Sequence, residues 1–228
     1  MHPGFFLSLW RVYKKDTALE FRNPAGMIAS LLFAFLLAVI YHYSMSEGAF
    51  SDRRNLNGLM LATLFFSSSL LAGRNLQFEK EGGAIRILVN SPVDTAGYYL
   101  GKVLALWQML TFFSAIYIPV YNILLTGRIA GAQAVFFPLM YLSLSSLSLA
   151  ALGILLSYLS SGNRLKDLIL PLILLPAAIP VFILAVDALQ DDGSAMIETG
   201  KHLIVLVAPG AIYASVGCWL YPHLAVEE

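Results

Sequence analysis

Long runs of apolar residues, separated by short polar connections, dominate the chain. Six of these runs are long enough for a helix to cross a hydrocarbon core of about 30 Å. We expect the membrane-spanning helices near residues 25–43, 56–73, 103–125, 134–160, 168–186 and 203–221. The pattern therefore predicts an all-α integral membrane protein with six transmembrane helices.

A different pattern precedes the first run. Its apolar residues recur at helical spacing, and its basic residues fall on the other face of the same helix. The apolar set is Phe5, Phe6, Leu9, Trp10 and Tyr13, and the basic set is Arg11, Lys14 and Lys15. This pattern predicts an amphipathic helix that lies in the membrane interface. Asn23-Pro24 ends it, because the residue before a proline disfavours helical conformation.

The connection between the second and third spans, residues 74–102, is long and keeps an apolar face. Its apolar residues Leu76, Phe78, Ile85, Leu88 and Val89 are interleaved with the charged residues Glu79, Lys80, Glu81 and Arg86. An amphipathic cytoplasmic helix broken at Gly82-Gly83 fits this pattern, and Asn90-Ser91-Pro92 stops it. Asp94 is a candidate N-cap for the next helix. The apolar face needs a cover, which is either a cytoplasmic partner or the lipid headgroups.

Basic residues in the connections predict the orientation, because Lys and Arg are retained on the cytoplasmic side. Ten of them fall on one side, namely Arg11, Lys14, Lys15, Arg22, Arg74, Lys80, Arg86, Lys102, Arg164 and Lys166. Four fall on the other side, namely Arg53, Arg54, Arg128 and Lys201. We therefore expect both termini in the cytoplasm.

Composition supports the membrane class. Of the 228 residues, 58% are hydrophobic and 12% are charged, whereas soluble domains carry about 25% charged residues. Six spans use nearly the whole length, so residues 1–228 are expected to form a single transmembrane domain. The formal net charge is zero, which gives no indication of a nucleic-acid partner. The single cysteine, Cys218, excludes an internal disulfide.

Two groups of residues inside or beside the spans are candidate functional positions. Pro171, Pro176 and Pro180 all lie in the fifth span, which should be kinked or broken, either for packing or as a gate that moves. His42 ends the first span and His202 begins the sixth, so both are expected at the external interface. Two histidines at similar depth are candidate haem ligands, although interfacial histidines without such a role are common.

No sequence pattern predicts an enzyme. A nucleotide-binding loop needs G-x-x-x-x-G-K-[ST], but around Gly101-Lys102 the first glycine is replaced by Ala96 and the Ser or Thr by Val103. No metalloprotease or nucleophile-elbow motif is present either. ATP hydrolysis through a nucleotide-binding loop of this type is therefore excluded. We expect a permease without a metal site.

The stretch 78–107 reads FEKEGGAIRILVNSPVDTAGYYLGKVLALW and carries a resemblance to a known family. It combines an acidic, glycine-containing stretch, a Leu-rich turn that ends in Ser-Pro, and a helix start with Lys, Val and Trp. These features fall on Glu79, Glu81, Gly82, Gly83, Leu88, Ser91, Pro92, Lys102, Val103 and Trp107. With the six-span layout, they resemble the haem exporter protein B family (CcmB), the ABC-2-type permease of cytochrome c maturation.

A second stretch, residues 170–187, is similar to the Leu-Pro-Leu segment of that family followed by Ile-Pro, and Asn23-Pro24 also fits. The chain departs from the family pattern at residues 72–77, which read AGRNLQ, and at residues 161–164, which read SGNR. It is therefore placed among divergent members.

The resemblance implies a permease subunit that pairs with a separate ABC ATPase (CcmA-like). It implies further partners: a haem-handling membrane protein (CcmC-like), a small membrane subunit, membrane lipid and a second copy of the permease. ATP hydrolysis would drive release of a haem-loaded chaperone at the bacterial inner membrane. The ATPase-coupling residues would then be Phe78, Glu79, Glu81, Gly82, Gly83, Ile85, Leu88 and Pro92.

Two other functions stay open. The same architecture serves exporters of other substrates, such as a lipid-linked glycan or a drug, because the spans specify no cargo. A haem-binding membrane protein that uses His42 and His202 is an alternative of another class.

Overall fold

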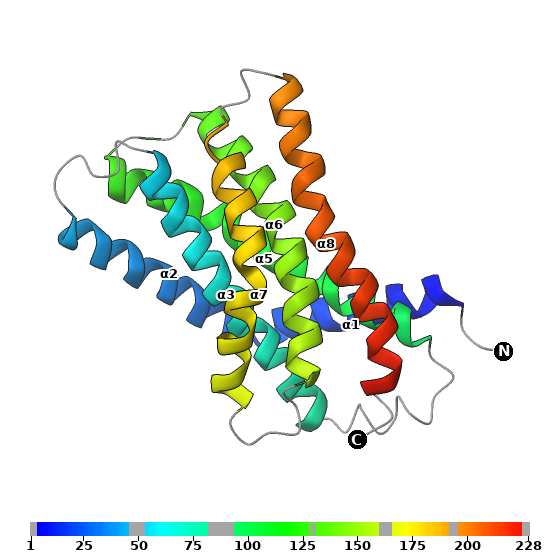
Figure 1. The fold of residues 1–228 in the computed structure, drawn as a ribbon. Coiled ribbons are helices and arrows are strands. Elements are labelled where there is room, and N and C mark those ends of the chain that lie inside the picture. Colours follow the sequence, from blue (N-terminus) through cyan, green and yellow to red (C-terminus); the bar gives the residue numbers. More distant parts are fainter. Residues whose placement is uncertain are drawn as a thin grey trace.

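The computed structural model describes residues 4–45, 53–81, 94–127, 129, 131–159, 166–191 and 196–224. Within these residues the chain forms seven α-helices and no strand: α1 (Phe5–Arg22), α2 (Ala25–Ser44), α3 (Arg53–Glu81), α5 (Thr95–Thr126), α6 (Ala132–Leu159), α7 (Lys166–Ala188) and α8 (Met196–Leu224). Six of them, all except α1, are long and apolar enough to cross a membrane (Figure 1). The predicted all-α architecture with six spans is confirmed.

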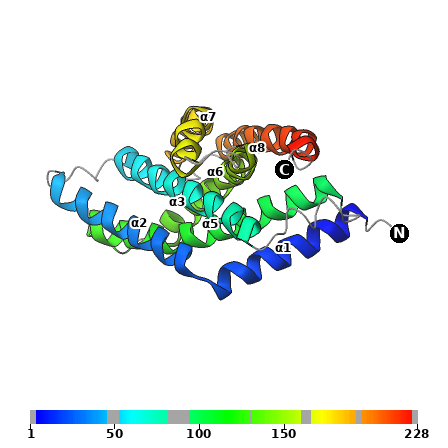
Figure 2. The ribbon, with the colours of Figure 1, turned by 90° about the horizontal axis from the view of Figure 1, so that it is seen from below.

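The helices are arranged around α6, which packs against α3, α5, α7 and α8. α2 lies at one edge of this group and contacts α3 and α5. Figure 2 shows α1 and α2 meeting at an angle along one edge of the molecule. Asn23-Pro24 separates the two helices, as predicted. We call this bend the elbow.

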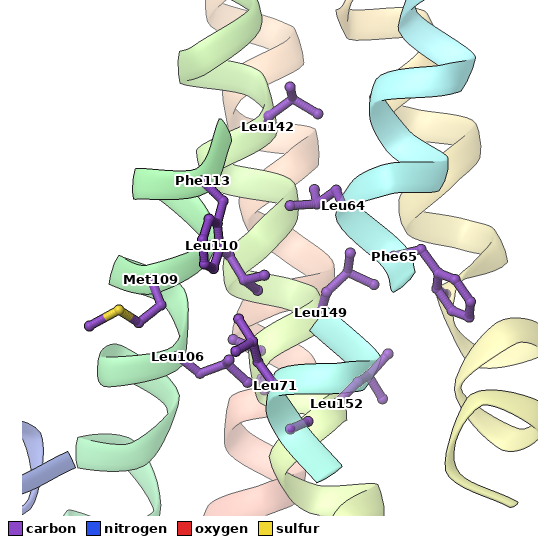
Figure 3. Packing of buried hydrophobic residues seen from close by; sticks show 14 of the residues in the cluster. Leu64, Phe65, Leu71, Leu106, Met109, Leu110, Phe113, Leu142, Leu149 and Leu152 are labelled. Atoms are coloured by element: carbon purple, nitrogen blue, oxygen red, sulfur yellow. The ribbon is translucent and has the colours of Figure 1, made fainter. Parts of the chain in front are cut away.

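The core lies between α3, α5 and α6. Figure 3 shows Leu64 and Leu71 of α3 together with Leu110 of α5 and Leu149 of α6, and each of these side chains is at most 1% exposed. Lipid tails are as apolar as leucine, so removal from water does not drive such a core inside a membrane. Its stability therefore depends on close van der Waals packing.

Glycines allow α1 to approach α5 closely. A Cβ added to Gly97 would lie 2.6 Å from the carbonyl oxygen of Phe5, and one added to Gly101 would lie 2.7 Å from that of Leu9. Both distances are shorter than any real Cβ contact, and the opposing atoms are backbone atoms that cannot move aside. The four-residue glycine spacing therefore brings the α1 backbone onto α5.

Two helix starts differ from the sequence expectation. α5 begins at Thr95 rather than near residue 103, because the side chain of Asp94 accepts a hydrogen bond from the Gly97 backbone N–H at 2.7 Å and caps the helix. The predicted cap at Asp94 is thus confirmed. α8 begins at Met196 rather than near residue 203, so polar residues that precede the predicted span belong to its first turns.

Candidate functional site at the elbow

α1 turns a polar stripe toward the protein. Its buried residues, Ser8, Val12, Asp16 and Glu20, are spaced every four positions and face α5. Five of its large apolar side chains are exposed, namely Phe6, Leu7, Trp10, Leu19 and Phe21. A helix is therefore present where it was predicted, but Phe5, Leu9 and Tyr13 of the predicted apolar face are half-buried. Its place in the membrane interface stays a prediction.

A buried ion pair joins α1 to α5. The Nζ atom of Lys102 donates hydrogen bonds to Asp16 Oδ2 at 2.9 Å and to Asn75 Oδ1 at 2.7 Å. The Lys102 and Asp16 side chains are 1% and 4% exposed. The ring of Tyr98 lies 5.2 Å from the same ammonium group, which adds a cation–π contact.

Asn75 brings α3 into this ion pair. Its side chain accepts from Lys102, and its Nδ2 atom lies 3.4 Å from Asp16 Oδ2, where it donates a long hydrogen bond. The amide thus completes a three-membered ring of polar contacts, with one member each from α1, α3 and α5. A buried charged group needs such partners, because an unpaired charge in a low-dielectric environment is costly.

The preceding residue of α3, Arg74, extends into the elbow. A Cβ added to Gly26 of α2 would lie 2.5 Å from Arg74 Nη1, so the guanidinium lies directly against the α2 backbone. The charge of Arg74 also acts on Glu20 of α1, which is 7% exposed. Within the described residues, Glu20 Oε2 has no hydrogen-bond partner. We name Asp16, Glu20, Arg74, Asn75 and Lys102 the elbow cluster.

The two carboxyl groups of the elbow cluster differ in their proton affinity. Burial raises the pKa of Asp16, but the charges of Lys102 and Lys15 and the hydrogen bonds from Lys102 and Asn75 outweigh it, so this pKa lies below its ordinary value of 3.8. Burial also raises the pKa of Glu20, and here it prevails over the charge of Arg74, so this pKa lies above 4.5. Asp16 is therefore the ionised anchor of the cluster.

The elbow cluster lies at the end of the apolar span of α3. The apolar span of α3 ends at Asn75, but the helix continues to Glu81. The backbone of the proposed coupling residues Phe78, Glu79 and Glu81 is therefore helical, and nothing is described of their side chains. The other proposed coupling residues, Gly82, Gly83, Ile85, Leu88 and Pro92, lie outside the described residues.

The sequence interpretation missed this cluster. It placed Lys102 at the end of the connection before the third span. The structure corrects this, because α5 starts early and Lys102 is a buried residue of that helix. The available signal was the four-residue spacing of Asp16 and Glu20 on the amphipathic helix, together with one lysine in a long run of α5 without another charge.

The two histidines are not brought together within one copy of the chain. His42 is exposed in the last turn of α2, with its ring against Tyr43. His202 lies in α8, where its Nδ1 atom is 3.6 Å from Asp191 Oδ2 and its ring meets Tyr141. α2 packs against α3 and α5, whereas α8 packs against α5, α6 and α7. Figures 1 and 2 show the end of α2 and the start of α8 well apart.

His202 belongs to a second polar group, at the turn between α7 and α8. Asp191 Oδ2 accepts hydrogen bonds from Tyr141 Oη at 2.8 Å and from Thr199 Oγ1 at 2.7 Å. Asp191 is 8% exposed at its side chain, so these bonds lie in a largely dry environment. They join α6, the end of α7 and the start of α8. We name Tyr141, Asp191, Thr199 and His202 the turn cluster.

The proline-rich span is an uninterrupted helix. α7 runs through Pro171, Pro176 and Pro180 from Lys166 to Ala188, so the span is not broken, and the alternative of a kink stays a prediction. Tyr213 Oη of α8 donates a hydrogen bond to the carbonyl of Ala177 at 3.0 Å, within the proline stretch. α7 is thereby tied to α8. A gating role of the three prolines stays a prediction.

The chain is similar to known proteins over most of its length. A family model described as CcmB protein matches residues 7–223. The heme exporter protein B of Pseudomonas aeruginosa is 26% identical to the chain over 200 residues, and the alignment covers 87% of each sequence. The family match includes most of α1 and all six spans.

Proposed function

The chain belongs to the CcmB family, whose members are haem-export ABC permeases, and we propose that it couples an ATPase to cytochrome c maturation. ATP hydrolysis in a separate subunit would drive release of a haem-loaded chaperone on the outer side of the membrane. The chain itself acts as a multi-pass subunit of the inner membrane.

One observation carries the family assignment: the match runs from residue 7 to residue 223 and therefore spans all six membrane helices and most of α1. A match confined to the hydrophobic spans would show only a shared composition. The resemblance of residues 78–107, between and around two spans, supports the same family independently of the apolar runs. The permease function rests on this agreement.

Coupling to the ATPase is assigned to the segment after the second span. α3 continues beyond its apolar part to Glu81, and this extension includes Phe78 and Glu79. A continuous helix is stiff, so a force applied to its end is transmitted to the bundle. We assign docking on a CcmA-like ATPase to the stretch from Phe78 to Pro92.

The other partners follow from the same assignment. A CcmC-like haem-handling protein, a small membrane subunit and a second copy of the permease complete the proposed complex. Both termini are assigned to the cytoplasm on the excess of Lys and Arg in the connections on that side. Membrane lipid covers the exposed apolar side chains of α2, α7 and α8.

Co-purification tests this proposal. The chain is isolated from its native membrane in mild detergent, as the wild type and with Glu79→Lys, Glu81→Lys or Ile85→Asp. An ABC ATPase is expected with the wild type and is expected to be lost or strongly reduced with these variants. Ile85→Val and Glu198→Lys are the matched controls, since the first keeps the apolar side chain and the second reverses an exposed charge in α8.

Two outcomes would contradict the proposal. If all three coupling variants retained the ATPase, the stretch from Phe78 to Pro92 would not be part of the interface with the ATPase. Absence of any ATPase from the wild type, with haem recovered in its place, would favour a haem-binding protein that uses His42 and His202. A Soret band lost in His42→Ala and His202→Ala would then identify the ligands.

A further inference from the structure

We propose that the elbow cluster is the joint that transmits movement of the α3 extension to α1 and α5. Asn75 is its central positioning residue, and Asp16 and Lys102 are the groups that it holds together. This inference rests on the proposed function, because it assumes that the end of α3 is moved by an ATPase.

The geometry places α3 at the meeting point of three other helices. Arg74 and Asn75 are successive residues, so their side chains leave the helix in different directions. Asn75 reaches Asp16 and Lys102 on α1 and α5. Arg74 reaches the backbone at Gly26 on α2. A tilt or rotation of α3 at this level must therefore displace both arms of the elbow and the start of α5.

The attachment of α1 to α5 does not depend on the elbow cluster alone. The first half of α1 already packs on Gly97 and Gly101. Tyr13 Oη also donates a hydrogen bond to Gln108 of α5. What the elbow cluster adds is the connection to α3. Because other contacts already hold α1 on α5, the elbow cluster is better explained as a link that transmits movement of α3 than as an attachment of α1.

The chemistry of the cluster suits a joint. A buried ion pair is weak evidence for stability, because well-packed apolar residues often serve as well. Its hydrogen bonds are directional, however, and a misaligned pair in a low-dielectric environment is unfavourable. Such a pair fixes the relative positions of its helices more sharply than apolar contacts do. The amide of Asn75 makes α3 part of that fixed geometry.

The test compares two substitutions in the assembled complex. Asn75→Leu removes the link from α3 and leaves the Asp16–Lys102 pair in place. Gln108→Leu is the matched control, because it removes a polar contact between α1 and α5 that does not involve α3. For each variant, cells are scored for mature c-type cytochrome, and the purified complex is assayed for the amount of bound ATPase and for ATP turnover.

Asn75→Leu is expected to keep its ATPase and its ATP turnover while cytochrome maturation falls roughly tenfold, the factor that corresponds to one hydrogen bond to a charged group. Gln108→Leu should stay within about twofold of wild type in all three measurements. A merely structural role would lower the amount of complex and all activities together, so uncoupling of ATP turnover from maturation is the diagnostic result.

The inference would be overturned if cells with Asn75→Leu made as much mature c-type cytochrome as cells with Gln108→Leu. It would also be overturned if the amount of complex, the ATP turnover and the maturation all fell together in Asn75→Leu. If Asn75→Leu does not accumulate, Asn75→Ser removes the same link with a smaller polar side chain and is judged by the same ratio of maturation to ATP turnover. Failure of the wild type to bind any ATPase would instead contradict the proposed function.

Discussion

Lys102 of α5 donates a hydrogen bond to Asp16 of α1 at 2.9 Å, which joins two residues 86 positions apart in the sequence. Both side chains are almost completely buried. The helix that precedes the first span is thereby tied to the third span. The pair makes the elbow an integral part of the bundle.

Breaking this pair from one side should destabilise the protein. Lys102→Met removes the buried cation of Asp16 and leaves only the half-exposed ammonium of Lys15, 3.3 Å from its Oδ1 atom, which we expect to cost about 2–4 kcal/mol of unfolding free energy. The double variant Asp16→Leu/Lys102→Met should recover most of the loss, since it leaves no unpaired charge. Thermal unfolding in detergent measures both. A single variant as stable as wild type would show that the pair is not desolvated.

The two acidic residues of the elbow cluster should respond to pH in opposite directions. The lowered pKa of Asp16 means that its contribution is present above its ordinary pKa of 3.8 and is lost as the pH falls through the lower folded-state value. The raised pKa of Glu20 means that its contribution is present below 4.5 and is lost as the pH rises through the higher folded-state value.

Glu20→Gln should therefore raise the melting temperature at neutral pH, and this gain should vanish in acid. Asp16→Asn should lower the melting temperature at neutral pH, and its penalty should shrink as the pH falls below 3.8. Melting curves of both variants between acid and neutral pH give the comparison. Equal pH profiles of the two variants would contradict the assigned difference in proton affinity.

The contact between α1 and α5 should not tolerate a side chain at Gly101. Its Cβ would lie 2.7 Å from a backbone oxygen, so Gly101→Ala is expected to cost about 1–3 kcal/mol. Gly58→Ala in α3 is the matched control, because nothing lies within 4 Å of its Cβ. That change should stabilise the helix by up to about 1 kcal/mol. Opposite shifts in the melting temperature are the expected result.

The turn cluster should contribute to stability through Asp191. Asp191→Ala leaves Tyr141 Oη and Thr199 Oγ1 without their acceptor, and we expect a loss of about 2–5 kcal/mol. Thr199→Val removes one of these donors and should cost less, about 1–2 kcal/mol. Chemical or thermal unfolding measures the two losses. A larger effect of Thr199→Val than of Asp191→Ala would exclude the carboxylate as the centre of the cluster.

The spans were predictable because membrane helices are long and uniformly apolar, so the mean hydropathy along the chain is enough to identify them. Helix starts were less predictable. The start of α5 depends on one cap, Asp94, and the stretch 95–102 contains glycines, tyrosines and a lysine that lower its mean hydropathy below that of the apolar run that follows. The cap was visible in the sequence, but how far the helix extended from it was not.

The elbow cluster could not be predicted for a different reason. Its members come from three helices, and their meeting depends on tertiary packing that no local pattern encodes. Asp16 and Glu20 lie one helical turn apart and have similar chemistry in the sequence, yet Asp16 accepts a hydrogen bond from Lys102, whereas Oε2 of Glu20 has no hydrogen-bond partner among the described residues. The coupling residues, by contrast, are predicted from a local pattern and a resemblance, and they stay a prediction.

The pairing of Asp16 with Lys102 also constrains the order of biogenesis. When α1 and the first span leave the ribosome, Lys102 has not yet been synthesised. Asp16 of α1 therefore has no buried partner at that stage and stays in contact with water at the membrane surface. Docking of α1 can follow only after the third span has been inserted. A helix synthesised before the first span thus takes its final place only after the third span.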